Sequence, residues 1–178
     1  MFILLFSRIY TCIFAPKLHN LSICSHFSRE KCRITFIGTG TGCILLSILS
    51  ELKNSKGVGV DISKKAIQIA IKNSIKHELA NKTKFLRKCF TKIYEQKFDL
   101  IVSNPPYIKK KDIKNLEDDV KKFEPKLALD GGNDGLDVIK KVIYKSSSIL
   151  KIKGMLALEI GNEQYKKVSK ILREKKFK

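Results

Sequence analysis

Short apolar runs alternate with amphipathic patterns along most of the chain. The runs have the length of buried strands and lie at residues 34–37, 57–60, 84–86, 99–102 and 155–160. Between them, apolar residues recur every three or four positions, which is typical of a helix with one buried face. The predicted buried faces are Ile44, Leu45, Ile48, Leu49 and Leu52; Ala66, Ile67, Ala70, Ile71, Ile75 and Leu79; and Leu136, Ile139, Val142, Ile143, Ile149 and Leu150. Ser63 is placed to cap the second of these helices, and residues 162–173 predict a last one.

This alternation indicates an α/β fold, with a mostly parallel sheet of five strands, helices on both faces and right-handed crossovers. The 178 residues suit about one domain. Residues 1–33 show neither a helical nor a strand period, so we expect an atypical N-terminal segment at 1–33 and a domain at 34–178. A transit-type targeting segment and a remnant of a longer sequence are both open for that segment. No apolar run approaches the roughly 20 residues of a membrane span, so we expect no membrane partner.

The first candidate site is a glycine-rich loop between the first predicted strand and helix. It reads Gly38-Thr39-Gly40-Thr41-Gly42, and Asp61 ends the next predicted strand. Glycines let the backbone approach a ligand closely, and a helix N-terminus presents free N–H groups. A carboxylate at the position of Asp61 can accept hydrogen bonds from ribose hydroxyls. These residues predict a nucleoside-type cofactor; a tight strand-to-helix turn beside a surface aspartate is the alternative.

The second candidate site follows the strand at residues 99–102 and reads Asn104-Pro105-Pro106-Tyr107. Ligands of open α/β sheets lie beyond the carboxyl ends of the strands, where this loop falls. The Asn104 side-chain oxygen and the Pro105 carbonyl are two acceptors on a backbone that its prolines make rigid. They can hold both N–H bonds of a planar NH₂ group and aim its nitrogen, while the Tyr107 ring offers a flat surface. An ordinary proline-rich turn is the alternative.

The two sites together predict methyl transfer from S-adenosylmethionine to an amino or amide nitrogen. A sulfonium is a strong leaving group, so the protein needs chiefly alignment and the exclusion of water. Neither motif contains an evident general base. The five cysteines form no Cys-x-x-Cys pair and no zinc spacing with histidine, so we expect no metal site and free thiols in a cytoplasmic protein.

The chain is strongly basic, and this changes the expected partners. Thirty-six Lys and Arg against seventeen Asp and Glu give a net charge of +19. Such an excess favours a nucleic-acid or ribosomal partner, whereas the even spread of the lysines suits a lysine-biased proteome. We therefore expect nucleic acid as an optional partner only. Charged residues gather at 109–122, where we expect an exposed, partly helical excursion, and residues 130–135 have the composition of a turn.

The sequence resembles the HemK/PrmC family of protein-(glutamine N5) methyltransferases, which modify peptide chain release factors. The matching stretches are residues 38–44, 60–63, 98–108 and 123–136, and the last is more specific to the release-factor branch than to the ribosomal-protein branch. The resemblance implies a Rossmann-like class I S-adenosylmethionine-dependent methyltransferase fold and a GGQ-motif glutamine as substrate. It assigns catalysis and substrate binding to Asn104, Pro105, Pro106 and Tyr107. It assigns cofactor binding to the glycine loop, Asp61 and Asn104.

Several positions depart from the family pattern. Phe36 stands where the family has an aspartate before the first glycine. Lys88 and Cys89 stand where it has an aspartate and a tryptophan beside the adenine. The family's helical N-terminal domain and last two strands are missing, which predicts an incomplete fold with an exposed sheet edge. Two other functions therefore stay open, an adenine-N6 methyltransferase for RNA or DNA and a non-catalytic remnant of the glutamine enzyme.

Overall fold

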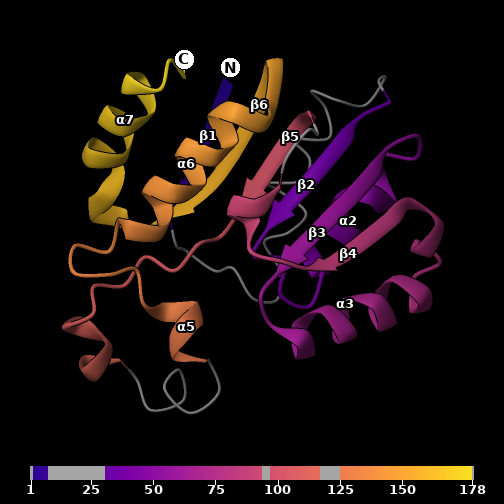
Figure 1. Cartoon of the computed structure of the whole chain (residues 1–178), viewed down its shortest axis with the longest axis horizontal. Helices are drawn as coiled ribbons and strands as arrows, with labels where there is room; N and C mark the ends of the chain where they lie inside the picture. Colours follow the sequence, from indigo (N-terminus) through magenta and orange to yellow (C-terminus); the bar gives the residue numbers. More distant parts are fainter. Residues whose placement is uncertain (1, 8–30, 94–96, 117–124, 178) are drawn as a thin grey trace.

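The computed structural model describes residues 2–7, 31–93, 97–116 and 125–177. In these residues one sheet of six strands has the order β1-β6-β5-β2-β3-β4 (Figure 1). Its strands are β1 (Phe2–Ser7), β2 (Arg33–Ile37), β3 (Lys56–Asp61), β4 (Thr83–Arg87), β5 (Phe98–Ser103) and β6 (Leu150–Ile160). Every neighbouring pair of strands is parallel, which confirms the predicted α/β architecture.

The longer helices fall where the sequence predicts them, whereas the four-residue helix at Lys126–Leu129 has no counterpart among the predicted elements. The helices are α2 (Cys43–Glu51), α3 (Lys64–Lys76), α5 (Lys126–Leu129), α6 (Asp137–Ile149) and α7 (Tyr165–Glu174), with short turns η1 (Ala80–Lys82), η2 (Phe90–Lys92), η3 (Asp112–Asn115) and η4 (Asn162–Gln164). Ser63 caps α3, since its hydroxyl accepts a hydrogen bond from the Ala66 N–H at 3.2 Å. The expected charged excursion contains η3, and its residues 117–122 lie outside the described part. Within the described residues, no helix has both the length and the apolarity to cross a membrane.

Two hydrophobic cores lie on opposite faces of the sheet, because successive strand residues point to opposite sides. In β2, Ile34 and Phe36 join the core that α2 covers, whereas Ile37 joins the core that α6 and α7 cover. Gly57 in β3 allows α2 to come close, since a Cβ there would lie 2.7 Å from the Leu49 side chain. The helices thus press on both faces and fix the strands between them.

The sheet has one more strand than the sequence pattern predicts. β1 pairs with β6 in parallel register, with Phe2 opposite Met155 and Ser7 opposite Ile160. The expectation of five strands is therefore wrong, because β1 pairs with the outer side of β6 and becomes the outermost strand there. In the sequence the apolar run at residues 2–6 is not followed by a helical period, so the alternation of strands and helices that marks the other strands does not mark this one. The division of the chain at residues 33 and 34 stays a prediction.

Two details of the predicted helices are also wrong. The apolar period places Ile71 and Ile75 on the buried face of α3, but they are 42% and 63% exposed, and Ser74 is buried instead. The same period places Leu150 in the helix before β6, but Leu150 is the first residue of that strand. Local periodicity cannot decide either point, because the width of a buried face depends on what packs against the helix.

We predict that the cores, rather than exposed apolar residues, carry the stability of the fold. Ile101 in β5 is fully buried, so Ile101→Ala should lower the free energy of unfolding by about 2–5 kcal/mol. The matched control is Ile152→Ala in β6, where the side chain is 95% exposed and the loss should be at most about 1 kcal/mol. Urea unfolding followed by circular dichroism measures both. Equal losses in the two variants would contradict this account of the core.

Candidate functional site

The two predicted sites lie beside each other because the strands before them are neighbours. The glycine loop follows β2, Asp61 ends β3, and Asn104 follows β5, and β2 lies between the other two strands. All three strands run parallel, so their carboxyl ends meet at one edge of the sheet. The Ser103 hydroxyl, which is buried, donates a hydrogen bond to the Ile37 carbonyl at 2.9 Å and ties the ends of β5 and β2 together.

The glycine loop takes a backbone conformation that requires glycine. Gly38, Gly40 and Gly42 have φ angles of 72°, 54° and 81°, in the left-handed region. The N–H groups of Gly38 and Thr39 donate to the Val60 carbonyl at 2.9 and 3.0 Å, so the loop folds back over the end of β3. The loop is therefore a fixed element of the site.

The space in front of this loop fits a ligand. A Cβ placed on Gly38 or Gly40 would meet no atom within 4 Å, whereas a Cβ on Gly42 would lie 3.1 Å from the Ala70 side chain. The loop thus has one open side lined by backbone and one packed side against α3. Thr39 also has a buried hydroxyl with no hydrogen-bond partner in the described structure. The residues present suit a nucleoside-type cofactor held against bare backbone.

Asp61 is oriented toward the glycine loop. One carboxylate oxygen accepts from the Gly40 N–H at 2.9 Å, and the other accepts from the Ser63 N–H at 2.8 Å. The residue is half-buried, and each carboxylate oxygen keeps a further lone pair. Asp61 can therefore accept hydrogen bonds from a diol beside the loop. Ile62, which sequence reasoning did not single out, follows it with 49% of its surface exposed.

The positions that depart from the family pattern differ in burial and in hydrogen bonding. Phe36 is 3% exposed and is part of the core beneath α2. Lys88 is exposed, and its backbone N–H donates to the Asp61 carbonyl at 2.9 Å. Cys89 is half-buried beside it, and a hydrogen bond with the Thr91 hydroxyl lowers the pKa of its thiol, with smaller help from Lys92.

The Asn104–Tyr107 loop leaves its first residue free to bind. Asn104 is exposed, and within the described residues its side chain makes no hydrogen bond, whereas Pro105 after it is buried. The chain then pairs with a second loop, because the Ile108 N–H donates to the Leu129 carbonyl at 3.2 Å. In return the Ile108 carbonyl accepts from the Gly131 N–H at 2.9 Å.

Two glycines of the predicted turn pack directly against the Asn104–Tyr107 loop. A Cβ on Gly131 would lie 2.9 Å from the Pro106 carbonyl oxygen, and one on Gly135 would overlap the Tyr107 carbonyl oxygen. The stretch that carries the release-factor resemblance is thus the support on which the second site rests.

A carboxylate fixes the end of this turn. The Leu136 N–H and the Lys140 ammonium group both bond to Asp134 and lower the pKa of its carboxyl group. The folded-state pKa is therefore below that of the unfolded chain. Asp134 accordingly contributes stability at neutral pH that is lost as the pH falls through the folded-state value.

Sequence reasoning missed two polar residues behind the second site. The Tyr107 hydroxyl donates to the Glu159 carboxylate at 3.4 Å, and Gln164 bonds to the Tyr107 carbonyl at 3.1 Å. Both are buried, at 8% exposure each. Glu159 lies within an apolar strand and Gln164 within a polar turn, so neither pattern marks them as part of a site.

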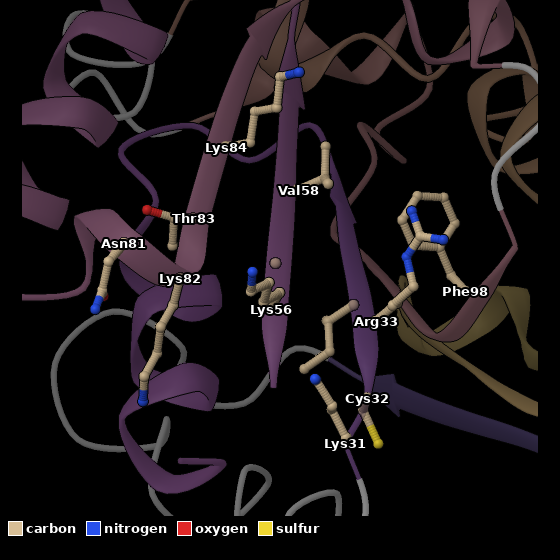
Figure 2. Close-up of a pocket in the computed structure, with 12 residues that line it drawn as sticks. Lys31, Cys32, Arg33, Lys56, Val58, Asn81, Lys82, Thr83, Lys84 and Phe98 are labelled. Atoms are coloured by element: carbon tan, nitrogen blue, oxygen red, sulfur yellow. The ribbon is translucent and has the colours of Figure 1, made fainter. Parts of the chain in front are cut away.

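A basic pocket lies at the other end of the strands, away from the two loops. It has a volume of about 430 Å³ among the amino ends of β2, β3 and β4 (Figure 2). Its lining includes no acidic residue among those described and five basic ones, which are Lys31, Arg33, Lys56, Lys82 and Lys84. None of the predicted site residues lines this pocket.

The chain matches the family model described as "Methyltransferase domain" over residues 28–176. It is 42% identical over 149 residues to the release factor glutamine methyltransferase of Fusobacterium nucleatum, covering 83% of this chain and 42% of that protein. It is 39% identical over 128 residues to the ribosomal protein uL3 glutamine methyltransferase of Francisella tularensis, covering 71% and 40%. The chain thus spans less than half the length of these curated relatives.

The fold has a close counterpart among solved structures. The crystal structure of a ribosomal protein L11 methylase from Lactobacillus delbrueckii subsp. bulgaricus superposes with a TM-score of 0.66 and 16% identity, over 93% of this chain and 70% of that one. At 16% identity the comparison shows the fold alone. The superposition confirms the Rossmann-like methyltransferase architecture. The cofactor of this domain is S-adenosylmethionine. The chain belongs to the methyltransferase-domain family, and its resemblance to the HemK/PrmC enzymes is confirmed.

Proposed function

We propose that this protein transfers a methyl group from S-adenosylmethionine to the side-chain amide nitrogen of the GGQ glutamine in a peptide chain release factor. The observation that carries the proposal is the meeting of the two loops at adjacent strand ends. Asn104 emerges from β5 next to the glycine loop on β2, and the Ser103–Ile37 hydrogen bond holds these two strand ends together. A hydrogen-bond acceptor for an amide and a binding loop for a nucleoside therefore lie at the carboxyl ends of neighbouring strands.

The cofactor half of the proposed site uses backbone and one carboxylate. Gly38 and Gly40 leave room for the cofactor against the loop, and Asp61 accepts from the ribose hydroxyls. S-adenosylmethionine supplies an electrophilic methyl group on a sulfonium. The chain then needs only to hold the two reactants in line and keep water out, and the proposal asks for no nucleophilic side chain.

The substrate half holds a flat amide by its two N–H bonds. The Asn104 side-chain oxygen takes one hydrogen, and the Pro105 carbonyl takes the other. An amide nitrogen is a poor nucleophile because its lone pair is delocalised, so its orientation toward the methyl group matters most. Pro105 and Pro106 have fixed φ angles, which keeps these acceptors in place, and the Tyr107 ring adds a surface for the amide.

The choice of glutamine over adenine rests on the turn at residues 130–136. That turn supports the Asn104–Tyr107 loop through Gly131 and Gly135, and it belongs to the stretch at residues 123–136 that resembles release-factor enzymes. The basic pocket would favour a nucleic acid, but it lies at the amino ends of the strands (Figure 2). Asn104 and the residues of its loop do not line this pocket, so the pocket gives no support for a base at Asn104.

The direct test is a methyl-transfer assay with labelled S-adenosylmethionine. Purified release factor and ribosomal RNA compete as substrates, and mass spectrometry locates the label. We expect label on the GGQ peptide and none on a release factor whose GGQ glutamine is replaced by glutamate. Label on adenine would reverse the substrate assignment, and bound cofactor without any transfer would favour a non-catalytic remnant.

We predict that Asp61→Ala weakens binding of S-adenosylmethionine by about 10- to 150-fold. The substitution removes charged hydrogen bonds worth about 1.5–3 kcal/mol. Isothermal titration calorimetry measures the change. The matched control is Glu51→Ala at the far end of α2, which removes the same charge from an exposed position. Equal affinity in the two variants would remove Asp61 from the cofactor site.

We predict that Lys88→Asp combined with Cys89→Trp tightens cofactor binding by about 5- to 150-fold. The pair would restore an acceptor and an aromatic surface beside Asp61, and one buried hydrogen bond is worth about 1–3 kcal/mol. The charge control is Lys84→Asp, an exposed lysine on β4, the strand that precedes Lys88. Unchanged affinity in the double variant, measured by the same titration, would show that these positions do not face the adenine.

We predict that Asn104→Ala lowers the rate of methyl transfer by orders of magnitude and changes cofactor affinity far less. Without the Asn104 oxygen the substrate amide can rotate out of line, so the loss falls on turnover. Asn104→Asp keeps an acceptor and should keep part of the activity. Asn81→Ala, at the opposite edge of the sheet, is the control for loss of an exposed asparagine. Full activity in Asn104→Ala would overturn the mechanism.

A further inference from the structure

Gln164 connects three parts of the chain behind the substrate half of the site. It lies in η4, directly after β6, and its side chain is 8% exposed. The side-chain oxygen accepts from the Gly161 N–H at 3.0 Å. The side-chain nitrogen donates to the Tyr107 carbonyl at 3.1 Å and to the Gly135 carbonyl at 3.0 Å. One amide thus joins the residue that follows β6, the Asn104–Tyr107 loop and the turn at residues 130–135.

The three bonds leave this amide only one favourable orientation. Its two N–H groups each meet a carbonyl, and its oxygen meets an N–H. Turning the amide over would bring its oxygen against the carbonyls of Tyr107 and Gly135, and its NH₂ group against the Gly161 N–H. Burial makes such unmatched contacts costly, because no water compensates them.

The walls of the slot are as restricted as its hydrogen bonds. A Cβ on Gly135 would lie 2.8 Å from the Gln164 side-chain nitrogen, and one on Gly161 would lie 3.3 Å from its oxygen. Glycine at both positions lets the backbone close around the amide. The slot therefore fits a side chain with the length and shape of glutamine.

We infer that Gln164 is a positioning residue that holds the Asn104–Tyr107 loop in register for methyl transfer. The inference rests on the proposed function, because the loop's acceptors are those proposed for the substrate amide. Pro105 and Pro106 have no N–H, so these two residues donate no backbone hydrogen bond. The bond from Gln164 to the Tyr107 carbonyl anchors the loop three residues after Asn104. Loss of this anchor lets the Asn104 and Pro105 oxygens move relative to the cofactor.

The test compares Gln164→Glu with Gln164→Met. Glutamate keeps the size of the side chain, but its carboxylate faces two carbonyl oxygens and cannot donate to either. We expect the kcat of Gln164→Glu at pH 8 to fall about 10- to 100-fold, with the Kd for S-adenosylmethionine within about threefold of the original. Methionine fills the slot without hydrogen bonds and should show the same loss of kcat.

The pH profile separates positioning from loss of structure. Burial against carbonyl oxygens disfavours the carboxylate, so the carboxyl group should take up a proton as the pH falls and regain one donor. Between pH 8 and pH 6 the activity of Gln164→Glu, relative to the unmutated chain, should therefore rise several-fold. Gln164→Met has no such proton and should show no recovery. The matched control is Gln68→Glu on the exposed face of α3, with activity and pH profile unchanged.

Amide hydrogen exchange gives a readout that does not need activity. In Gln164→Met, the N–H groups of Gly161 and Ile108 should exchange faster, while those of β2 and β3 keep their protection. If this occurs but the unmutated chain modifies no release factor, the positioning inference stands and the proposed substrate fails. Unchanged exchange at Ile108 together with unchanged kcat in Gln164→Met would overturn the inference. A parallel loss of cofactor affinity and of protection in β2 would also overturn it, because the role would then be structural alone.

Discussion

The end of β2 is held from both sides, and the candidate site depends on that constraint. On one side the Val60 carbonyl accepts from the Gly38 and Thr39 N–H groups, and on the other the Ser103 hydroxyl donates to the Ile37 carbonyl. These bonds fix where β2 stops relative to β3 and β5. A slip of one residue in a strand would turn its side chains to the other face of the sheet, so the register cannot vary freely.

Different interactions determine the conformations of the two loops at the carboxyl ends of β2 and β5. The glycine loop gains its shape from residues with positive φ and from backbone bonds to β3. The Asn104–Tyr107 loop contains two prolines and gains its shape from what packs behind it. Because Gly131 and Gly135 have no side chains, the supporting turn can contact the backbone carbonyls of the loop. The Gln164 side chain donates hydrogen bonds to the Tyr107 and Gly135 carbonyls. The first loop thus depends on glycines with positive φ and on bonds to β3, whereas the second depends on packing by residues that come later in the chain.

The substitutions relative to the family pattern affect the two halves of the site unequally. Phe36 adds to the core beneath α2, so this position contributes to packing rather than to a polar cofactor contact. Lys88 and Cys89 follow β4 at the point where the Lys88 backbone N–H meets the Asp61 carbonyl, and the family pattern described above has an aspartate and a tryptophan at these positions. None of the departures from the family pattern noted above falls on Asn104, Pro105, Pro106 or Tyr107. The differences therefore concentrate on the adenine side of the proposed cofactor site.

The sequence by itself determined the parallel α/β fold, the positions of α2, α3, α6 and α7 within a few residues, and the two loops that form the site. It could do so because apolar period, glycine loops and prolines act through local geometry. Only the tertiary structure decided that β1 covers the edge of β6, that Ile71 and Ile75 are exposed, and that Gln164 lies behind the substrate loop. These features depend on which residues from distant parts of the chain meet. A buried glutamine reads as an ordinary polar turn residue until its carbonyl partners, 57 and 29 positions away, are in place.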